Sequence, residues 1–362
     1  MKTFRSEYGA IDRLVHRLAF RGVHIQIAVS DIEDVLFSNA LRAIHIERPV
    51  FITSLPRSGT TTLLQILCDT WPFAAHSYAD MPFVLCPLLW QRLTQRFRRS
   101  DGARERAHGD GVLVNYDSPE AFEEIVWRAF WPKMYSGTRI QTWAAGQADE
   151  EFAQFFLSHM RKIILVRQSS PQTLRYVSKN NANIARLGLI REMFPDSTVV
   201  IPFRNPRDHA VSLLRQHANF SALQEEDAFA RQYMQYVGHQ EFGNVLAPID
   251  FDGWLGSHSN LDPHELPFWL QYWCVTFECV LRERTAGLVL LDYDRMCADP
   301  AASLRALASC LQCNGDSLTS IHTDRVRPAR TYNEVQLDES SGLGSRAMST
   351  YARLRSLAIN CR

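Results

Sequence analysis

Residues 49–62 read PVFITSLPRSGTTT, an apolar run that ends in a polar turn. The run holds the β-branched and aromatic residues typical of a buried strand. We expect this strand to break into a tight turn that opens directly into a helix. A helix start presents unpaired backbone N–H groups and positive partial charge, and both favour a bound anion. The stretch therefore predicts a phosphate-binding loop.

The side chains of this turn suit an anion, but they differ from those of common nucleotide-binding loops. Gly59 allows close backbone approach, and Arg57 supplies a full positive charge. Aligned on the pattern GxxxxGK[ST], Ser54 replaces the first glycine and Thr60 replaces the lysine. An ordinary nucleoside triphosphatase would therefore lack its main phosphate cation here.

A second stretch, VVIPFRNPRDHAVS at residues 199–212, predicts another strand, turn and helix. Arg204 leaves the end of this strand, and Ser212 lies on the helix. With both stretches in this order, the chain resembles the sulfotransferase superfamily that uses 3′-phosphoadenosine 5′-phosphosulfate (PAPS). The resemblance implies that Arg204 and Ser212 hold the 3′-phosphate, and that the PRSGTT loop holds the 5′-phosphosulfate. The loop residues concerned are Arg57, Ser58, Gly59, Thr60, Thr61 and Thr62.

The resemblance also implies a reaction, which is transfer of the sulfuryl group to an acceptor hydroxyl by in-line displacement, leaving adenosine 3′,5′-bisphosphate. The family often carries a lysine near the leaving phosphate or the acceptor, and Lys179 follows a predicted strand. The acceptor must lose a proton, so a carboxylate or histidine has to reach it. Asp80 is the first candidate for this base and His76 the second, with structural or capping roles as the alternative for both.

The bulk composition limits the partners. The chain has 362 residues, with 39 basic and 39 acidic side chains, so nothing attracts it as a whole to nucleic acid. Neither a secretory signal nor a run of ~20 apolar residues is visible, and we expect a cytoplasmic protein. We expect no metal site, because the sequence shows neither HExxH nor paired CxxC motifs. The acceptor class and the oligomeric state stay open, a homo-oligomer included.

The fold class predicted from strand, helix and strand with short connections is α/β: a central parallel sheet flanked by helices, P-loop-like. Three parts are expected: a helical preface at 1–47, a catalytic domain at 48–312, and an extension at 313–362 that packs on or covers the cofactor site. Within the catalytic domain we expect a helix that begins at Ser118, and loops with a short helix covering a cleft over 220–258. Glu123 and Glu124 are interpreted as surface residues, and the alternative is that one of them lines the acceptor cleft.

Two other functions remain as alternatives. The strand that ends in Asp292 resembles one that holds a metal-binding carboxylate, which a P-loop kinase or nucleoside triphosphatase with magnesium would use. The other alternative is a nucleotide-binding module without catalysis. The arginine-rich stretch at 92–106 is interpreted as a solvated face rather than an acceptor site.

Overall fold

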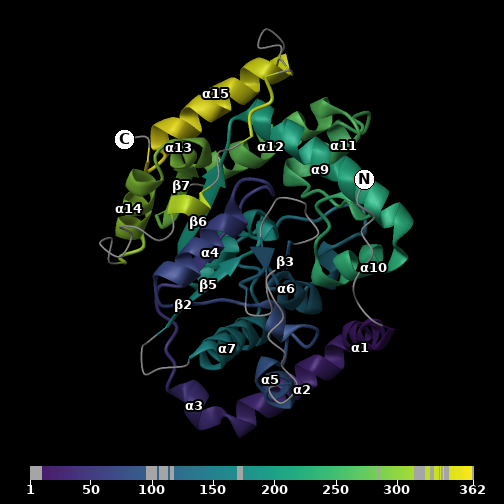
Figure 1. The fold of residues 1–362 in the computed structure, drawn as a ribbon, viewed down its shortest axis with the longest axis vertical. Helices are drawn as coiled ribbons and strands as arrows, with labels where there is room; N and C mark the ends of the chain where they lie inside the picture. The colour runs from purple at the N-terminus through teal and green to yellow at the C-terminus, as the bar shows by residue number, and fades with distance from the viewer. Residues whose placement is uncertain are drawn as a thin grey trace.

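The computed structural model contains a five-stranded sheet in which all neighbours pair in parallel, in the order β2-β5-β1-β6-β7 (Figure 1). Helices lie on both faces of this sheet, so the predicted α/β fold class is confirmed. The structure describes residues 10–94, 104–105, 113–114, 118–168, 174–283, 286–313, 323–326, 330–333, 335, 337 and 342–360.

The strands are short, and their register places their carboxyl ends at one edge of the sheet. Val50 of β1 pairs with Val177 of β5 on one side and with Thr198 of β6 on the other. The loops that follow β1, β5 and β6 therefore leave the sheet side by side. The strands are β1 (Val50–Ile52), β2 (Phe73–Ala74), β3 (Arg104–Glu105), β4 (Leu113–Val114), β5 (Arg175–Lys179), β6 (Thr198–Phe203) and β7 (Leu288–Asp292).

Alternate residues of the strands enter two separate cores, because side chains of a strand point to opposite faces. Val50 and Ile52 pack with α4, α13 and α14, whereas Phe51 packs with α6, α7, α8 and α12. All three side chains are fully buried. A strand buried on both faces is a nearly continuous apolar run, which is how residues 50–52 read in the sequence.

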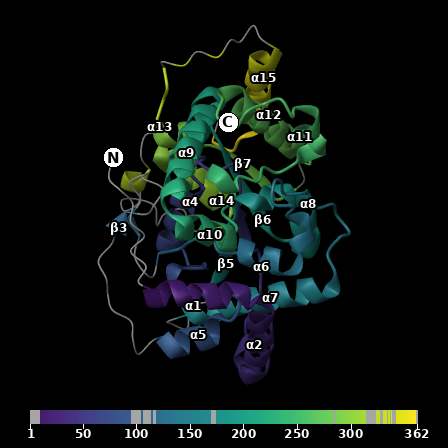
Figure 2. The same ribbon diagram turned by 90° about the vertical axis from the view of Figure 1, so that its right-hand side faces the viewer.

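Two groups of helices lie at opposite ends of the molecule, and other helices lie beside the sheet. In Figures 1 and 2, α9, α12 and α15 lie at one end, and α1, α2, α5 and α7 lie at the other. The helices are α1 (Ala10–Arg21), α2 (Val23–Leu36), α3 (Ser38–Arg42), α4 (Thr60–Thr70), α5 (Pro87–Thr94), α6 (Glu124–Phe130), α7 (Glu150–Arg167), α8 (Leu187–Met193), α9 (Pro206–Glu226), α10 (Ala228–Val237), α11 (Trp254–Ser257), α12 (Leu266–Arg282), α13 (Tyr293–Ala298), α14 (Pro300–Cys310) and α15 (Gly342–Leu357). No described helix combines the length and apolar composition needed to cross a membrane.

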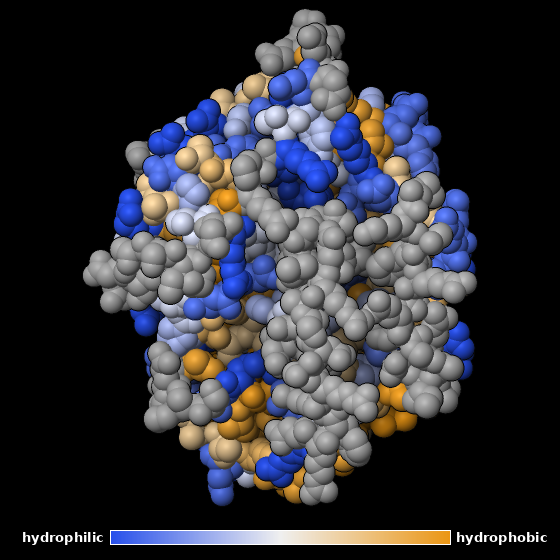
Figure 3. All heavy atoms as spheres, in the orientation of Figure 1, coloured by the Kyte–Doolittle hydropathy of each residue, from blue (hydrophilic) through white to orange (hydrophobic). Residues whose placement is uncertain are grey.

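The N-terminal helices are tied to the core by buried polar contacts. The ammonium of Lys162 on α7 donates to the Ser30 carbonyl and lies 3.6 Å from the Glu33 carboxylate, with both charged side chains fully buried. Burial raises the pKa of Glu33 to about 7, although Lys162 opposes the shift. Apolar side chains are exposed along α2, and Figure 3 shows orange atoms gathered at the end that holds α2, α3 and α5. The division of the chain into three parts remains a prediction.

Several expected elements differ in the structure. The helix expected at Ser118 begins at Glu124, because Pro119 instead forms a bridge with Ser77. The expectation of loops with a short helix over 220–258 is wrong at its start, because α9 continues to Glu226 before α10 follows. Asp227 explains this break between two helices, since its carboxylate accepts hydrogen bonds from the first N–H groups of α10. The short edge strand β2 and the helix α15 were not predicted.

Candidate functional site

The loop between β1 and α4 is a tight turn with two residues in the left-handed region. Arg57 has φ +71° and Gly59 has φ +90°. The Ser58 hydroxyl donates to the Leu55 carbonyl at 2.8 Å, which closes the turn. Because Ser58 is fully buried, its side chain fixes the loop from within. A tight turn closed by one of its own side chains thus follows β1.

Gly59 cannot be replaced without disturbing this turn. A Cβ atom at this position would lie 2.0 Å from the Tyr293 ring, and a side chain would also be strained at positive φ. Gly59 is the N-cap of α4, which begins at Thr60 and has no side-chain cap. The first backbone N–H groups of α4 are therefore arranged as in other anion-binding helix starts.

The second loop, after β6, touches the first one. Arg204 is almost buried, and its Nη1 donates to the Arg57 carbonyl at 3.2 Å. Its Nη2 donates to the Arg330 carbonyl at 2.9 Å, and its Nε lies 3.4 Å from Asp294 Oδ1. The side chain of one arginine predicted to bind the nucleotide thus contacts the main chain of the other.

Helix α9 fixes the second loop against the first. Asn205 caps the helix by accepting from the Arg207 N–H at 3.0 Å, and Pro206 occupies the first turn. His209 Nε2 lies 2.8 Å from the Pro56 carbonyl, so this nitrogen donates. Burial, together with the charges of Arg204 and Arg57, lowers the pKa of His209 to about 3. His209 is therefore neutral and adds no charge of its own.

Ser212 lies on the same helix, and a segment from the C-terminal part of the chain contacts the helix start. Ser212 is buried, with 5% of its surface exposed. The Tyr332 N–H donates to Asp208 Oδ1 at 3.0 Å, and the Arg215 guanidinium lies 4.4 Å from the centre of the Tyr332 ring. Residues 330–332 thus lie against the loop that carries Arg204. Whether the whole extension from 313 covers a cofactor remains a prediction.

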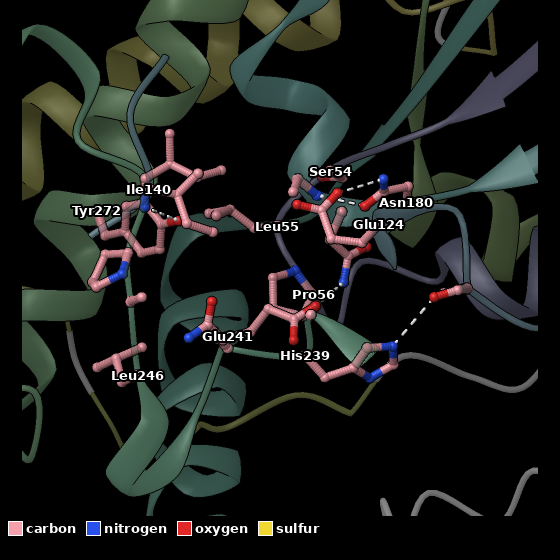
Figure 4. Close-up of a pocket in the computed structure, with 18 of the residues that line it drawn as sticks. Ser54, Leu55, Pro56, Glu124, Ile140, Asn180, His239, Glu241, Leu246 and Tyr272 are labelled. Carbon is pink, nitrogen blue, oxygen red and sulfur yellow. Dashed lines mark hydrogen bonds between the residues drawn. The ribbon is translucent and has the colours of Figure 1, made fainter. Parts of the chain in front are cut away.

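A pocket opens beside the first loop, at the carboxyl ends of β1 and β5. Its empty space is about 570 Å³ when the open solvent at its mouth is included. Figure 4 shows Glu124 beside Ser54 and Asn180, with Glu241 and His239 near Pro56. Ile140, Leu246 and Tyr272 form the opposite, apolar wall. The pocket therefore joins polar groups next to the phosphate-type loop with apolar surface farther away.

Two features of the pocket and loop suit a ligand with an anionic end. Ser54 is one of the lining residues, and its buried Oγ has no hydrogen-bond partner among the described residues. Buried hydroxyls are normally paired, so this one is unsatisfied. Lys179, the last residue of β5, also lines the pocket, with 7% of its surface exposed. The pocket lining thus includes an unsatisfied hydroxyl residue and a lysine.

Comparison with known proteins decides the family. A family model described as the sulfotransferase family matches residues 49–243, more than half of the chain, including both loops. The chain belongs to the sulfotransferase family. None of the curated proteins matches the chain.

Solved sulfotransferase structures resemble the chain only distantly. STF1 from Mycobacterium tuberculosis H37Rv is 14% identical, with 93% of this chain and 85% of that one covered and a TM-score of 0.48. STF9 from Mycobacterium avium is 16% identical, with 90% and 77% covered and a TM-score of 0.48. The sulfotransferase domain of the Synechococcus PCC 7002 olefin synthase is 11% identical, with 86% and 95% covered and a TM-score of 0.40. Likenesses of this degree carry no argument about residues.

The two residues predicted as bases of this sulfotransferase are not among those that line the pocket. Asp80 accepts from the Ser77 N–H at 2.9 Å, and Arg167 is ion-paired with the same carboxylate oxygen. His76 Nε2 lies 2.8 Å from His159 Nε2, and burial lowers the pKa of His76 to about 4. Both side chains have at most 1% of their surface exposed. A structural role, which was the alternative for both residues, accounts for these contacts. Their catalytic roles stay predictions.

The interpretation of Glu123 and Glu124 as surface residues is wrong. Glu123 is fully buried and accepts from Trp127 Nε1 at 3.1 Å, while Glu124 has 3% of its surface exposed. Both residues lie at the start of α6 beside an apolar stripe, and charged residues in such a position are usually exposed. Buried carboxylates need hydrogen-bond donors, and Tyr176 and Asn183 both donate to the Glu123 carboxylate.

The sequence also missed the pocket residues that follow α10. His239 and Glu241 lie just after Gly238, which ends the helix with φ +80°. A Cβ atom at Gly238 would lie 2.5 Å from Glu124 Cγ, so glycine lets this segment approach α6. A lone glycine after a helix is a common C-cap and does not predict a pocket.

The carboxylate that supported a magnesium-dependent alternative has other partners. Asp292 is fully buried, accepts from the Arg295 N–H at 3.0 Å, and lies 3.1 Å from Arg355 Nε. Within the described parts of the chain, no three His, Cys, Asp or Glu side chains are grouped as a metal site would require. The Asp292 carboxylate thus caps α13 and pairs with α15.

Proposed function

We propose that this sulfotransferase moves the sulfuryl group from PAPS to the hydroxyl of an acceptor bound in the pocket beside the first loop. The observation that carries the proposal is the contact between the two loops, where Arg204 donates to the Arg57 carbonyl. One nucleotide with a phosphate at each end fits two anion-binding loops that adjoin at neighbouring strand ends.

The residues present fit such a donor. The backbone from 58 to 62 and Arg57 would hold the phosphosulfate, while Arg204 and Ser212 would hold the 3′-phosphate. The donor supplies the activated sulfuryl group, and the protein supplies fixed positive charge where negative charge develops on the leaving phosphate. Lys179, at the pocket edge, would add a further positive charge there. Ser54 Oγ would gain the partner that it lacks within the described chain.

The magnesium-dependent kinase or nucleoside triphosphatase is the weaker candidate. Its metal-binding carboxylate, Asp292, is already paired with Arg355 and with the start of α13. Its phosphate lysine is replaced by Thr60, whose hydroxyl instead donates to Asn181 Oδ1 at 3.4 Å. The acceptor stays open among sugars, lipids, phenols, peptides and polyketides, and a cytoplasmic location remains a prediction.

The test is transfer of labelled PAPS to a panel of hydroxyl acceptors in EDTA, with the product identified by its gain of one SO₃ group. We expect product from at least one acceptor class and none from labelled ATP. Adenosine 3′,5′-bisphosphate should also raise the melting temperature without magnesium. Stabilisation by magnesium nucleotide alone would support the kinase. Binding of adenosine 3′,5′-bisphosphate without turnover on any acceptor would support a non-catalytic module.

A further inference from the structure

The pocket contains two carboxylates from different elements, and their surroundings differ sharply. Glu124 belongs to α6, and Glu241 belongs to the segment after α10. A general base must have an oxygen lone pair available to the acceptor, and its negative charge must not be consumed by a fixed cation. The hydrogen bonds of the two side chains decide which of them meets these conditions.

Glu124 is fully engaged by the protein. Oε1 accepts from the Tyr135 hydroxyl, and Oε2 accepts from Asn180 Nδ2 at 2.7 Å. The buried guanidinium of Arg186 is ion-paired with the same Oε2. Arg186 is itself held against the Trp127 ring, 4.1 Å from the ring centre. Glu124 thus belongs to a closed polar network that shapes the pocket wall.

Glu241 is held by a single hydrogen bond. Its Oε1 accepts from Asn181 Nδ2 at 3.0 Å. Its Oε2 has no hydrogen-bond partner and no ion pair within the part of the chain that the structure describes. The carboxylate lies near Pro56 of the first loop in Figure 4, on the side of the pocket where the donor is proposed to bind.

Asn181 connects Glu241 to the first loop. The Asn181 carbonyl accepts from Thr53 Oγ1 at 3.1 Å, and its Oδ1 accepts from Thr60 Oγ1 at 3.4 Å. One amide side chain therefore bridges the start of α4 and the Glu241 carboxylate. The Glu241 carboxylate is therefore linked to the first loop through one intervening side chain.

The backbone around Glu241 is also held on both sides. The Ala247 N–H donates to the Gln240 carbonyl at 2.8 Å, and the Gly243 N–H donates to His217 Nδ1 at 3.1 Å. Burial and the charge of His264 lower the pKa of His217 to about 4, although the charge of Asp262 opposes the shift. His217 is therefore neutral at pH 7 and can accept this bond. A fixed backbone and a tethered carboxylate are the arrangement that proton abstraction needs.

We propose that Glu241 is the general base of sulfuryl transfer, an inference that rests on the function proposed above. The acceptor oxygen forms a bond to sulfur while the bond from sulfur to the bridging phosphate oxygen breaks. The hydroxyl proton passes to Glu241 Oε2, and the electrons of the broken bond stay on the phosphate of adenosine 3′,5′-bisphosphate. Asn181 is the positioning residue that holds the carboxylate beside the loop.

The test compares Glu241→Gln with Glu225→Gln, an exposed glutamate on α9, using an acceptor that the wild-type enzyme sulfates. We expect kcat to fall by about 10²–10⁴ in Glu241→Gln, because the amide cannot take the proton. The dissociation constant for adenosine 3′,5′-bisphosphate should stay within about twofold of wild type. Glu225→Gln should match wild type in both measurements, and Glu241→Asp should recover part of the rate.

A second readout separates a base from a merely structural residue. Fluorination beside the acceptor hydroxyl makes its proton easier to lose, so the deficit of Glu241→Gln should shrink at least tenfold with a fluorinated acceptor. The wild-type rate should also fall toward acidic pH, and this fall should be absent in the variant.

Two results would overturn the inference while the proposed function stands. One is a Glu241→Gln enzyme as fast as Glu225→Gln. The other is a deficit that is the same for both acceptors, which would mean that the side chain only shapes the pocket. If His239→Gln lost the rate and Glu241→Gln kept it, His239 would be the general base instead. Its Nε2 lies 3.4 Å from the Ala121 carbonyl. If wild type sulfates no acceptor, the proposed function itself fails.

Discussion

The two loops proposed to hold the donor and the pocket proposed to hold the acceptor lie side by side, but they are built in different ways. Each donor loop is one continuous stretch, 53–62 or 204–212, whose turn, glycine and helix start are local in sequence. The pocket instead is lined by residues 54–56, 121, 124, 140, 179–182, 238–241, 246–249 and 272. The proposed anion binding depends on backbone geometry that short motifs encode. The proposed acceptor binding depends on where distant segments pack.

The largest expected effect concerns Arg57 in the first loop, on the proposed donor side of the comparison. Arg57→Ala should leave a folded protein whose turnover falls by about 10²–10³, since one preorganised cation facing the leaving phosphate is lost. Arg231→Ala, an exposed arginine on α10, is the matched control and should keep wild-type turnover. Steady-state transfer from labelled PAPS and a thermal melt give the two measurements. Wild-type turnover in Arg57→Ala would count heavily against the assignment of this loop.

The next prediction concerns the histidine that the sequence suggested as a base. Burial lowers the pKa of His76 to about 4, so the unfolded chain binds its proton between pH 6.5 and 4 while the folded chain does not. Stability therefore falls as the pH drops through this window, and His76 should account for about 2–3 kcal/mol of the loss by pH 4.5.

Urea unfolding at pH 7 and pH 4.5 measures this loss. His76→Gln should lose less stability than wild type over the same change, whereas replacing the exposed His45 by glutamine should leave the loss unchanged. Identical losses in all three proteins would show that the folded protein can protonate His76 without a loss of stability. His76 would then be a candidate for the general base again.

A smaller effect should separate the two donor loops from each other. Arg204→Ala should weaken binding of adenosine 3′,5′-bisphosphate about tenfold to a hundredfold, since a charge-assisted hydrogen bond contributes roughly 1.5–3 kcal/mol. Adenosine 5′-phosphate, which lacks the 3′-phosphate, should lose much less affinity. Equal losses for both nucleotides in a calorimetric titration would mean that Arg204 only supports the first loop through the Arg57 carbonyl.

The smallest effect tests the connection between the two regions. Asn181→Ala should lower kcat about tenfold with nucleotide affinity unchanged, because the Glu241 carboxylate loses its tether but not its chemistry. Asn260→Ala, at an exposed position, serves as the control. A change in nucleotide affinity without a change in kcat would place Asn181 with the donor loops instead.

The contrast between local motifs and long-range packing also explains which features could be predicted from the sequence. The strand at 198–203, the helix after Gly59 and the neighbouring loops follow from apolar runs, one glycine and a proline at a helix start. Asp80 and His76 are the candidates that the sequence offers, because the family resemblance implies a histidine or acidic base downstream of the first loop. The sequence could not show that Arg167 and His159, both on α7, already engage them. Glu241 was missed because only tertiary packing brings it to Asn181.

Calorimetric titration of adenosine 3′,5′-bisphosphate in EDTA, into wild type, Arg57→Ala and Arg204→Ala, tests most directly whether the adjoining loops form one nucleotide site. We predict binding to wild type without any divalent ion, and at least a tenfold loss of affinity in each variant. Binding that needs magnesium, or that neither substitution weakens, would contradict the account.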